Sequence, residues 1–242
     1  MTMLDSARLK RRTDRLEFHL RDGAMKRPQM MLAFFALVTS AFASDSMMPQ
    51  DVAAIAHRWA FISYQMPEKE REEAFKSLAA EADRLASASP GRAEPLVWEA
   101  IVLASYAKVQ GGMGALSKVR KARDLLLAAK RIDPDTLNGS IYTALGHLYA
   151  KVPGWPIGFG DREEARALLQ TALEVNPTGI DPNYFYADFL ANQGDYAKAR
   201  EYLNRALAAP ARPGREDADA GRRRDIERLL AEISSKSHMA NQ

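Results

Sequence analysis

Apolar residues recur at helical spacing along much of the chain. Residues 52–65 and 68–87 show this spacing in succession, which predicts a pair of amphipathic helices joined by a short turn. Residues 215–234 carry apolar side chains at positions i, i+3, i+4 and i+7, which suits a terminal capping helix. Residues 90–95, with a proline at each end, predict a turn or short linker. No stretch alternates like a strand, so we predict an all-α protein.

A repeated pattern organises the central region. Alanine, leucine, alanine and proline return at the spacing Ala-x3-Leu-x2-Ala-x4-Pro, with the last proline one residue early: Ala122, Leu126, Ala129 and Pro134; Ala165, Leu169, Ala172 and Pro177; Ala199, Leu203, Ala206 and Pro210. The last two copies are 34 residues apart. Small residues let two helices approach closely, and a proline ends a helix, so each copy predicts the second helix of a hairpin.

The first helices of these hairpins carry a matching signature. Tyr142, Leu145, Gly146 and Tyr149 are spaced as in helix A of the tetratricopeptide repeat, and the run QGDYAKAREYLNRAL is very like that family's helix-turn-helix. The segment from about residue 98 to 210 therefore resembles tetratricopeptide repeats. The resemblance implies an α-solenoid of stacked antiparallel helix hairpins, because a single hairpin cannot bury its apolar face alone.

Together with the charge and hydropathy of the first 43 residues, these patterns predict a domain organisation, and the resemblance implies a binding surface. We expect an upstream extension, a signal peptide, an N-terminal helix pair, the repeats, a C-terminal capping helix and a tail, over residues 1–24, 25–43, 44–95, 96–210, 211–236 and 237–242. In the repeat register, several side chains face the concave groove where the family binds its partners: Thr143, His147, Lys151, Tyr184, Asp188 and Asn192. The groove is suited to a protein or peptide partner. The alternative is that these side chains form a solvated face.

One repeat carries an insertion between its two helices. Seven extra residues fall in the run VPGWPIGF, whose prolines and glycines exclude a helix and which places Trp155 on a loop. A tryptophan on a rigid loop is suited to contact a partner. Alternatively, Trp155 folds back and covers the open end of the hairpin.

The run KVPGWPIGFGDREEARALLQTALEVNPTGIDPNYFYADFL points to a narrower group. It is similar to the periplasmic T-component of TRAP transporters, whose members associate with a substrate-binding protein. This resemblance covers about residues 140–210 and implies, as an alternative function, an accessory subunit of a solute transport system. The family's members are commonly lipoproteins, whereas this chain has no cysteine to carry a lipid.

Charge and hydropathy in the first 43 residues predict export. Lys26 and Arg27 precede a 14-residue apolar run that ends in Ala41-Phe42-Ala43, the order found in a signal peptide cleaved after Ala43. We therefore expect translation to start at Met25 and the mature protein to be periplasmic or secreted, with no stable membrane span after cleavage. The same segment holds eight basic and four acidic residues, so the net charge of +3 lies in the leader and gives no support for nucleic-acid binding.

Motifs that carry chemistry are missing from the sequence. There is no cysteine, no HExxH, no GxSxG and no phosphate-binding glycine motif, so we predict no catalytic residue, no metal and no cofactor. The leading hypothesis is a non-enzymatic interaction module, and self-association is compatible with it. A third hypothesis, an enzyme on an α-solenoid, would need a deep pocket holding His147 or a buried carboxylate.

Overall fold

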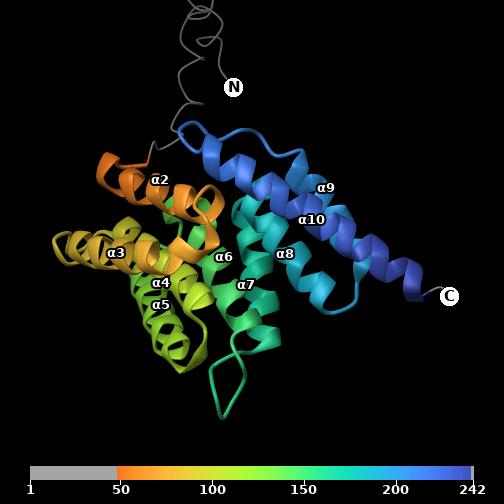
Figure 1. Ribbon diagram of the computed structural model, residues 1–242, viewed down its shortest axis with the longest axis horizontal. Coiled ribbons are helices and arrows are strands. Elements are labelled where there is room, and N and C mark those ends of the chain that lie inside the picture. Colours follow the sequence, from red (N-terminus) through yellow and green to blue (C-terminus); the bar gives the residue numbers. More distant parts are fainter. Residues whose placement is uncertain (1–47, 241–242) are drawn as a thin grey trace, which may run out of the picture. The chain divides into compact units, whose positions relative to one another are not determined.

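The computed structural model describes residues 48–240, which form helices joined by turns and loops (Figure 1). The expected upstream extension and signal peptide lie outside the described residues. The described part contains nine helices: α2 (Gln50–Tyr64), α3 (Glu68–Ser87), α4 (Ala93–Gln110), α5 (Gly112–Ile132), α6 (Thr136–Lys151), α7 (Arg162–Val175), α8 (Ile180–Asn192), α9 (Tyr196–Leu207) and α10 (Glu216–Ala240).

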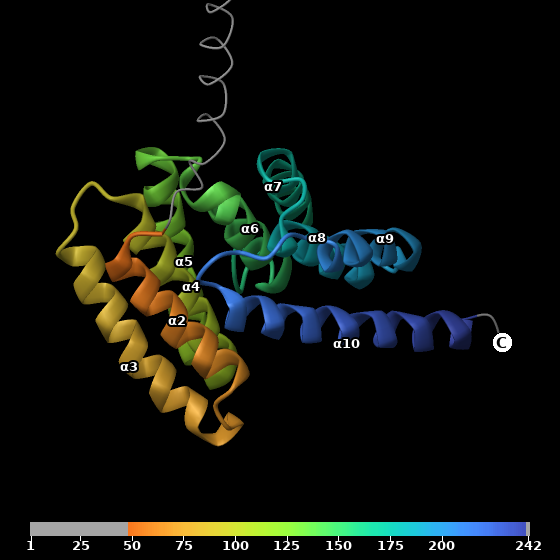
Figure 2. The same cartoon turned by 90° about the horizontal axis from the view of Figure 1, so that it is seen from above.

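The first eight helices stack as four consecutive hairpins (Figures 1 and 2). Both helices of each hairpin pack on the first helix of the next: α2 and α3 contact α4, α4 and α5 contact α6, and α6 and α7 contact α8. No strand occurs among residues 48–240. The predicted all-α solenoid is therefore confirmed.

The repeated positions form the apolar seam of the stack. Every alanine and leucine of the three copies is at most 1% exposed: Ala122, Leu126, Ala129, Ala165, Leu169, Ala172, Ala199, Leu203 and Ala206. At Gly146 a Cβ atom would lie 2.6 Å from Cγ of Leu169, so a glycine is needed for α6 and α7 to approach closely. The repeated alanines and leucines are thus the residues that pack the hairpins together.

Helix α10 does more than cover the last hairpin. It packs against α9 and α8 and also against α2, the first helix of the stack (Figure 2). A Cβ at Gly221 would lie 2.2 Å from the Tyr64 ring, and the Tyr64 hydroxyl donates a hydrogen bond of 3.2 Å to Asp225. The C-terminal helix therefore joins the two ends of the hairpin series, a contact that local sequence patterns do not reveal.

Two expected boundaries are wrong. Helix α4 begins at Ala93, inside the predicted turn over 90–95, because proline is tolerated in the first turn of a helix, where Pro95 lies. Helix α10 continues to Ala240, through most of the segment expected to be a tail. Within residues 48–240, no helix combines the length and hydropathy needed to cross a membrane.

Candidate functional site

The inner face of the stack, formed by α6 and α8 where they approach α10, is covered at its centre. Arg222 of α10 lies over two neighbouring rings of α8, 4.4 Å from the centroid of Tyr184 and 4.6 Å from that of Phe185. The Phe185 ring in turn packs against His147 of α6, with 4.6 Å between ring centroids. The predicted groove residue Tyr184 therefore contacts the protein's own C-terminal helix, and His147 lies behind Phe185, which contacts the same arginine.

A network of ion pairs holds α10 in this position. Asp181, at the start of α8, binds Arg212 at 2.7 Å and Arg222 at 2.8 Å, and Arg222 also pairs with Asp225 at 3.2 Å. Burial alone would raise the pKa of Asp181, but the two guanidinium groups outweigh it and hold that pKa well below its usual range. Arg222 is buried and its partners are half-buried, and the shared carboxylates link α8 to α10, so the network fixes the position of the helix.

His147 is neutral in this environment. Burial lowers the pKa of its imidazole to about 4; Asp188 opposes this shift, and the positive charges of Lys151, Arg222 and Lys108 add to it. The uncharged imidazole packs against the Phe185 ring, so His147 has a structural role on this face.

The predicted groove residues beyond α10 remain accessible. Lys151, at the end of α6, forms an ion pair of 2.8 Å with Asp188 of α8, and the Asn192 side chain donates to the Asp188 carboxylate at 3.1 Å. Lys151 and Asn192 also line a cavity of about 300 Å³ with four further residues: Ala150, Arg162, Phe189 and Gln193. This end of the inner face brings together two cations and two amides in front of a buried aromatic ring, an arrangement that can bind a polar chain.

Thr143 does not belong to this surface, and its prediction as a groove residue is wrong. It is 5% exposed, and its hydroxyl donates to the Gly139 carbonyl at 3.2 Å. Helix α6 packs against α4, α5, α7 and α8, so more of its surface is covered than the groove assignment assumes.

The inserted loop over residues 152–161 projects from the end of the α6–α7 hairpin (Figure 1). Trp155 is 90% exposed, so the alternative in which it covers the hairpin is wrong. The loop is held by hydrogen bonds within it and at its base: Gly160 N–H donates to the Pro153 carbonyl at 2.9 Å, and Asp161 N–H to the Tyr149 carbonyl at 3.0 Å. A defined loop therefore presents the indole to solvent.

Sequence reasoning missed the partners of the arginine run 222–224. The nearby acidic residues predict local neutralisation, and Asp225 does pair with Arg222. The partners far along the chain, Asp181 and the rings of α8, depend on the path of α10 across the stack. The cavity residues Arg162 and Phe189 were also missed, because the repeat register indicates only the groove positions of α6 and α8.

No group of His, Asp or Glu able to hold a metal ion occurs in the described part of the chain.

Residues 157–215 match the family model of the tetratricopeptide repeat, a range that covers α7, α8 and α9. That family is typically a non-catalytic scaffold for protein–protein interactions. A comparison with curated proteins found no match.

Proposed function

This chain is a tetratricopeptide-type repeat protein, and on that premise we propose that it is an exported module that binds a protein or peptide partner at the open end of its inner face. Repeat proteins of this type act as interaction modules in general. We place the binding site there because Lys151, Arg162, Phe189 and Asn192 line a cavity at that end.

The chemistry of that cavity favours an extended peptide. Lys151 and Arg162 offer charged donors to carboxylates or backbone carbonyls, and Asn192 and Gln193 offer amides that donate and accept. Phe189 lies behind these groups and is 2% exposed, so the wall that a ligand meets is mainly polar. Fixed donors and acceptors of this kind can orient an extended backbone through hydrogen bonds.

Export is the second part of the proposal. It is supported by the order of basic residues, apolar run and Ala-Phe-Ala in residues 25–43. A fusion of residues 25–60 to a reporter enzyme that is active only outside the cytoplasm tests it. Reporter activity that depends on Lys26, Arg27 and the apolar run supports export, and activity only in cytoplasmic fractions contradicts it.

The accessory-subunit alternative rests on the similarity of residues 140–210 to the T-component of TRAP transporters. It predicts that the partner is a solute-binding protein. The enzyme hypothesis needs a deep pocket that holds His147 or a buried carboxylate, and the cavity at the open end of the inner face is lined by neither.

Site-specific photocrosslinking tests the proposed binding site. A benzophenone amino acid at Gln193, which lines the cavity, is compared with the same group at Gln65; both are exposed glutamines at the C-terminal cap of an inner helix. We expect a discrete adduct in cells from position 193 only, with a lower yield when Lys151→Glu reverses a charge of the cavity wall. Equal adducts from both positions, or none from 193, would show that the inner face is not the binding site.

A further inference from the structure

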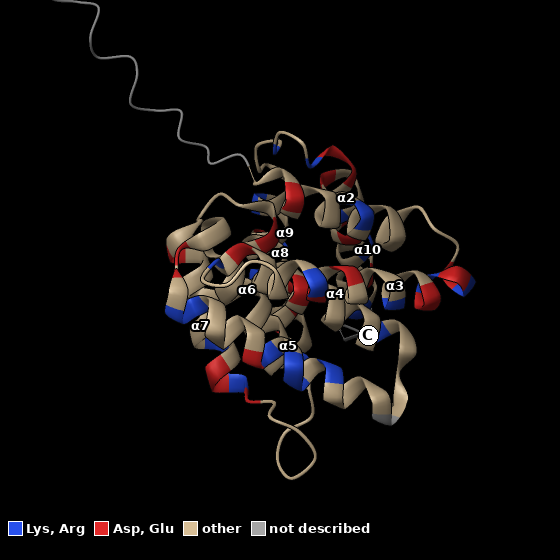
Figure 3. Ribbon diagram, turned by 90° about the vertical axis from the view of Figure 1, so that its left-hand side faces the viewer, with Lys and Arg blue, Asp and Glu red and all other residues tan. Residues whose placement is uncertain are grey.

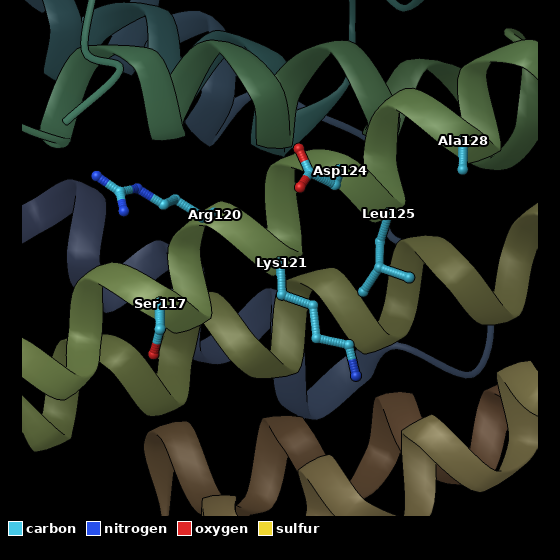
Figure 4. Close-up of a pocket in the computed structure, with 6 residues that line it drawn as sticks. All are labelled: Ser117, Arg120, Lys121, Asp124, Leu125 and Ala128. Atoms are coloured by element: carbon cyan, nitrogen blue, oxygen red, sulfur yellow. The ribbon is translucent and has the colours of Figure 1, made fainter.

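A second surface lies on the outward side of α5. Its side chains recur at i, i+3, i+4, i+7, i+8 and i+11 along the helix and line a cavity of about 540 Å³ (Figure 4): Ser117, Arg120, Lys121, Asp124, Leu125 and Ala128. Leu125 and Ala128 are half-buried and form its apolar part. We refer to these six residues as the α5 stripe.

Basic side chains predominate on α5, as the blue segments of Figure 3 show. The helix carries six Lys or Arg residues and one Asp. Lys121 is neutralised by Asp83 and Glu99, each at 2.7 Å, and Arg123 pairs with Asp124 at 2.8 Å. The remaining four have no ion pair among residues 48–240: Lys118, Arg120, Lys130 and Arg131. Lys118 and Lys130 are half-buried over the rings of Tyr106 and Tyr142, whereas Arg120 and Arg131 are exposed, so the charge of these two arginines is open to a partner.

The inserted loop joins this surface. Arg120 donates a hydrogen bond of 3.0 Å to the Ile157 carbonyl, and the Arg123 guanidinium lies 4.6 Å from the centroid of the Phe159 ring. These contacts hold the loop against α5 while leaving Trp155 90% and Ile157 63% exposed. Two large apolar side chains thus stand next to unpaired positive charge, and residues 152–160 contain no acidic side chain.

We propose that the α5 stripe and the Trp155 loop form one docking surface for an acidic, amphipathic segment of a partner protein. Arg120, the cation of the stripe without an ion pair to any residue that the structure describes, complements its carboxylates, and Trp155 and Ile157 bury against its apolar side chains. Tryptophan and arginine are the residues that most often dominate the energy of protein interfaces.

A protein segment fits this surface better than an anionic membrane does. Three exposed acidic residues follow the loop at its base, Asp161, Glu163 and Glu164, and an extended layer of negative headgroups would repel them. A peptide that follows α5 meets Arg120 and the loop, and it need not reach these three carboxylates.

This docking surface is distinct from the inner-face cavity. Lys151 reaches from the base of the loop to Asp188 of α8, whereas Arg120 and Arg123 hold the loop to α5. The two surfaces can therefore be tested separately.

The test uses the full-length protein and a fluorescein-labelled amphipathic peptide in which every charged position is Glu; the matched peptide has Lys at those positions. Fluorescence anisotropy measures binding. We expect the Glu peptide to bind, the Lys peptide not to bind, and added salt to weaken the complex. Arg120→Glu and Trp155→Ala should each weaken binding about tenfold or more. Lys69→Glu, the same charge reversal on an exposed lysine of α3, should leave it unchanged.

Several outcomes would overturn the proposal. The first two concern the peptides: the Glu and Lys peptides bind equally well, or neither Arg120→Glu nor Trp155→Ala changes binding of the Glu peptide. The third is that anionic phospholipid vesicles bind and the Glu peptide does not. The fourth is that the protein self-associates and Trp155→Ala abolishes this self-association. Circular dichroism of each variant shows that it remains folded. Lys151→Glu should not change the affinity for the Glu peptide, so failure at this surface is separate from failure of the proposed inner-face site.

Discussion

The α6–α7 and α8–α9 hairpins are two copies of one repeat that differ at their turns. The second turns within residues 193–195, whereas the first uses residues 152–161. Both second helices begin at an aspartate that accepts backbone N–H groups, Asp161 from Glu163 and Glu164 and Asp195 from Lys198. The helix start and the seam are thus the same in both copies, and the extra residues add a surface without altering the core.

The first prediction tests whether the two seams are equivalent. Leu169→Ala and Leu203→Ala each remove a side chain of 0% exposure, and each should lower the free energy of unfolding by about 2–5 kcal/mol. Urea unfolding followed by circular dichroism measures both losses. In the Leu169→Ala background, Gly146→Ala should cost less than it does in the wild type, because its Cβ then enters vacated space. A much smaller loss at Leu169 would show that the insertion loosens its hairpin.

A pH experiment sharpens the comparison at the inner helices. Folding lowers the pKa of His147 from 6.5 to about 4, mainly through burial. Above pH 6.5 the histidine is neutral in both states. As the pH falls from 6.5 to 4, the histidine is protonated in the unfolded chain but not in the folded chain, so the free energy of unfolding falls. Below pH 4 the histidine is protonated in both states, and its contribution to the free energy of unfolding is constant.

Replacing His147 with Gln should therefore reduce the loss of stability between pH 6.5 and pH 4 by about 2–3 kcal/mol. The measurement is urea unfolding at a series of pH values, with His57→Gln on the exposed face of α2 as the matched control. Identical pH profiles for wild type and His147→Gln would mean that the imidazole is solvated, and that α10 does not cover the inner face at that point.

The turns themselves should respond differently to the same substitutions. At Gly160 a Cβ would lie 1.8 Å from the Val152 carbonyl oxygen, whereas Gly194 has open space but a φ of +82°. Alanine at either position should cost about 1–3 kcal/mol. Asparagine tolerates the left-handed region, so Gly194→Asn should cost less than Gly194→Ala, while Gly160→Asn should cost at least as much as Gly160→Ala. Unfolding in urea compares the four variants. The same rank order at both sites would contradict the distinction between steric and conformational strain.

The seam was predictable from the sequence because it depends on local spacing. Alanine and leucine at fixed intervals describe one face of a helix, and the positions of Ala165, Leu169, Ala199 and Leu203 follow from that face. The seven-residue insertion was predictable for the same reason: proline and glycine end helices wherever the rest of the chain lies.

The site was less predictable because it depends on contacts between distant segments. A repeat register places His147 and Tyr184 on a common face, but it contains no information on what covers that face. The covering helix is fixed by ion pairs such as Asp181–Arg222, whose residues are 41 positions apart. Acidic residues flank the arginines within residues 216–227 and offer them local partners, so nothing in their spacing indicates the distant one.

The smallest effect on stability is expected at the loop tip. Trp155→Ala removes a side chain that is 90% exposed, so the free energy of unfolding should change by no more than about 0.5 kcal/mol. Trp98→Ala removes an indole of 3% exposure and should cost about 3–5 kcal/mol, which makes it the matched control. Chemical unfolding followed by circular dichroism compares them, because both variants lose a fluorophore. If Trp155→Ala cost more than about 1 kcal/mol, the indole would pack against the hairpin in solution, and the loop would be part of the core after all. If Trp155→Ala leaves the free energy of unfolding unchanged but abolishes binding of the acidic peptide, the two hairpins have different roles. Both then stabilise the stack, and only the α6–α7 hairpin presents a contact surface.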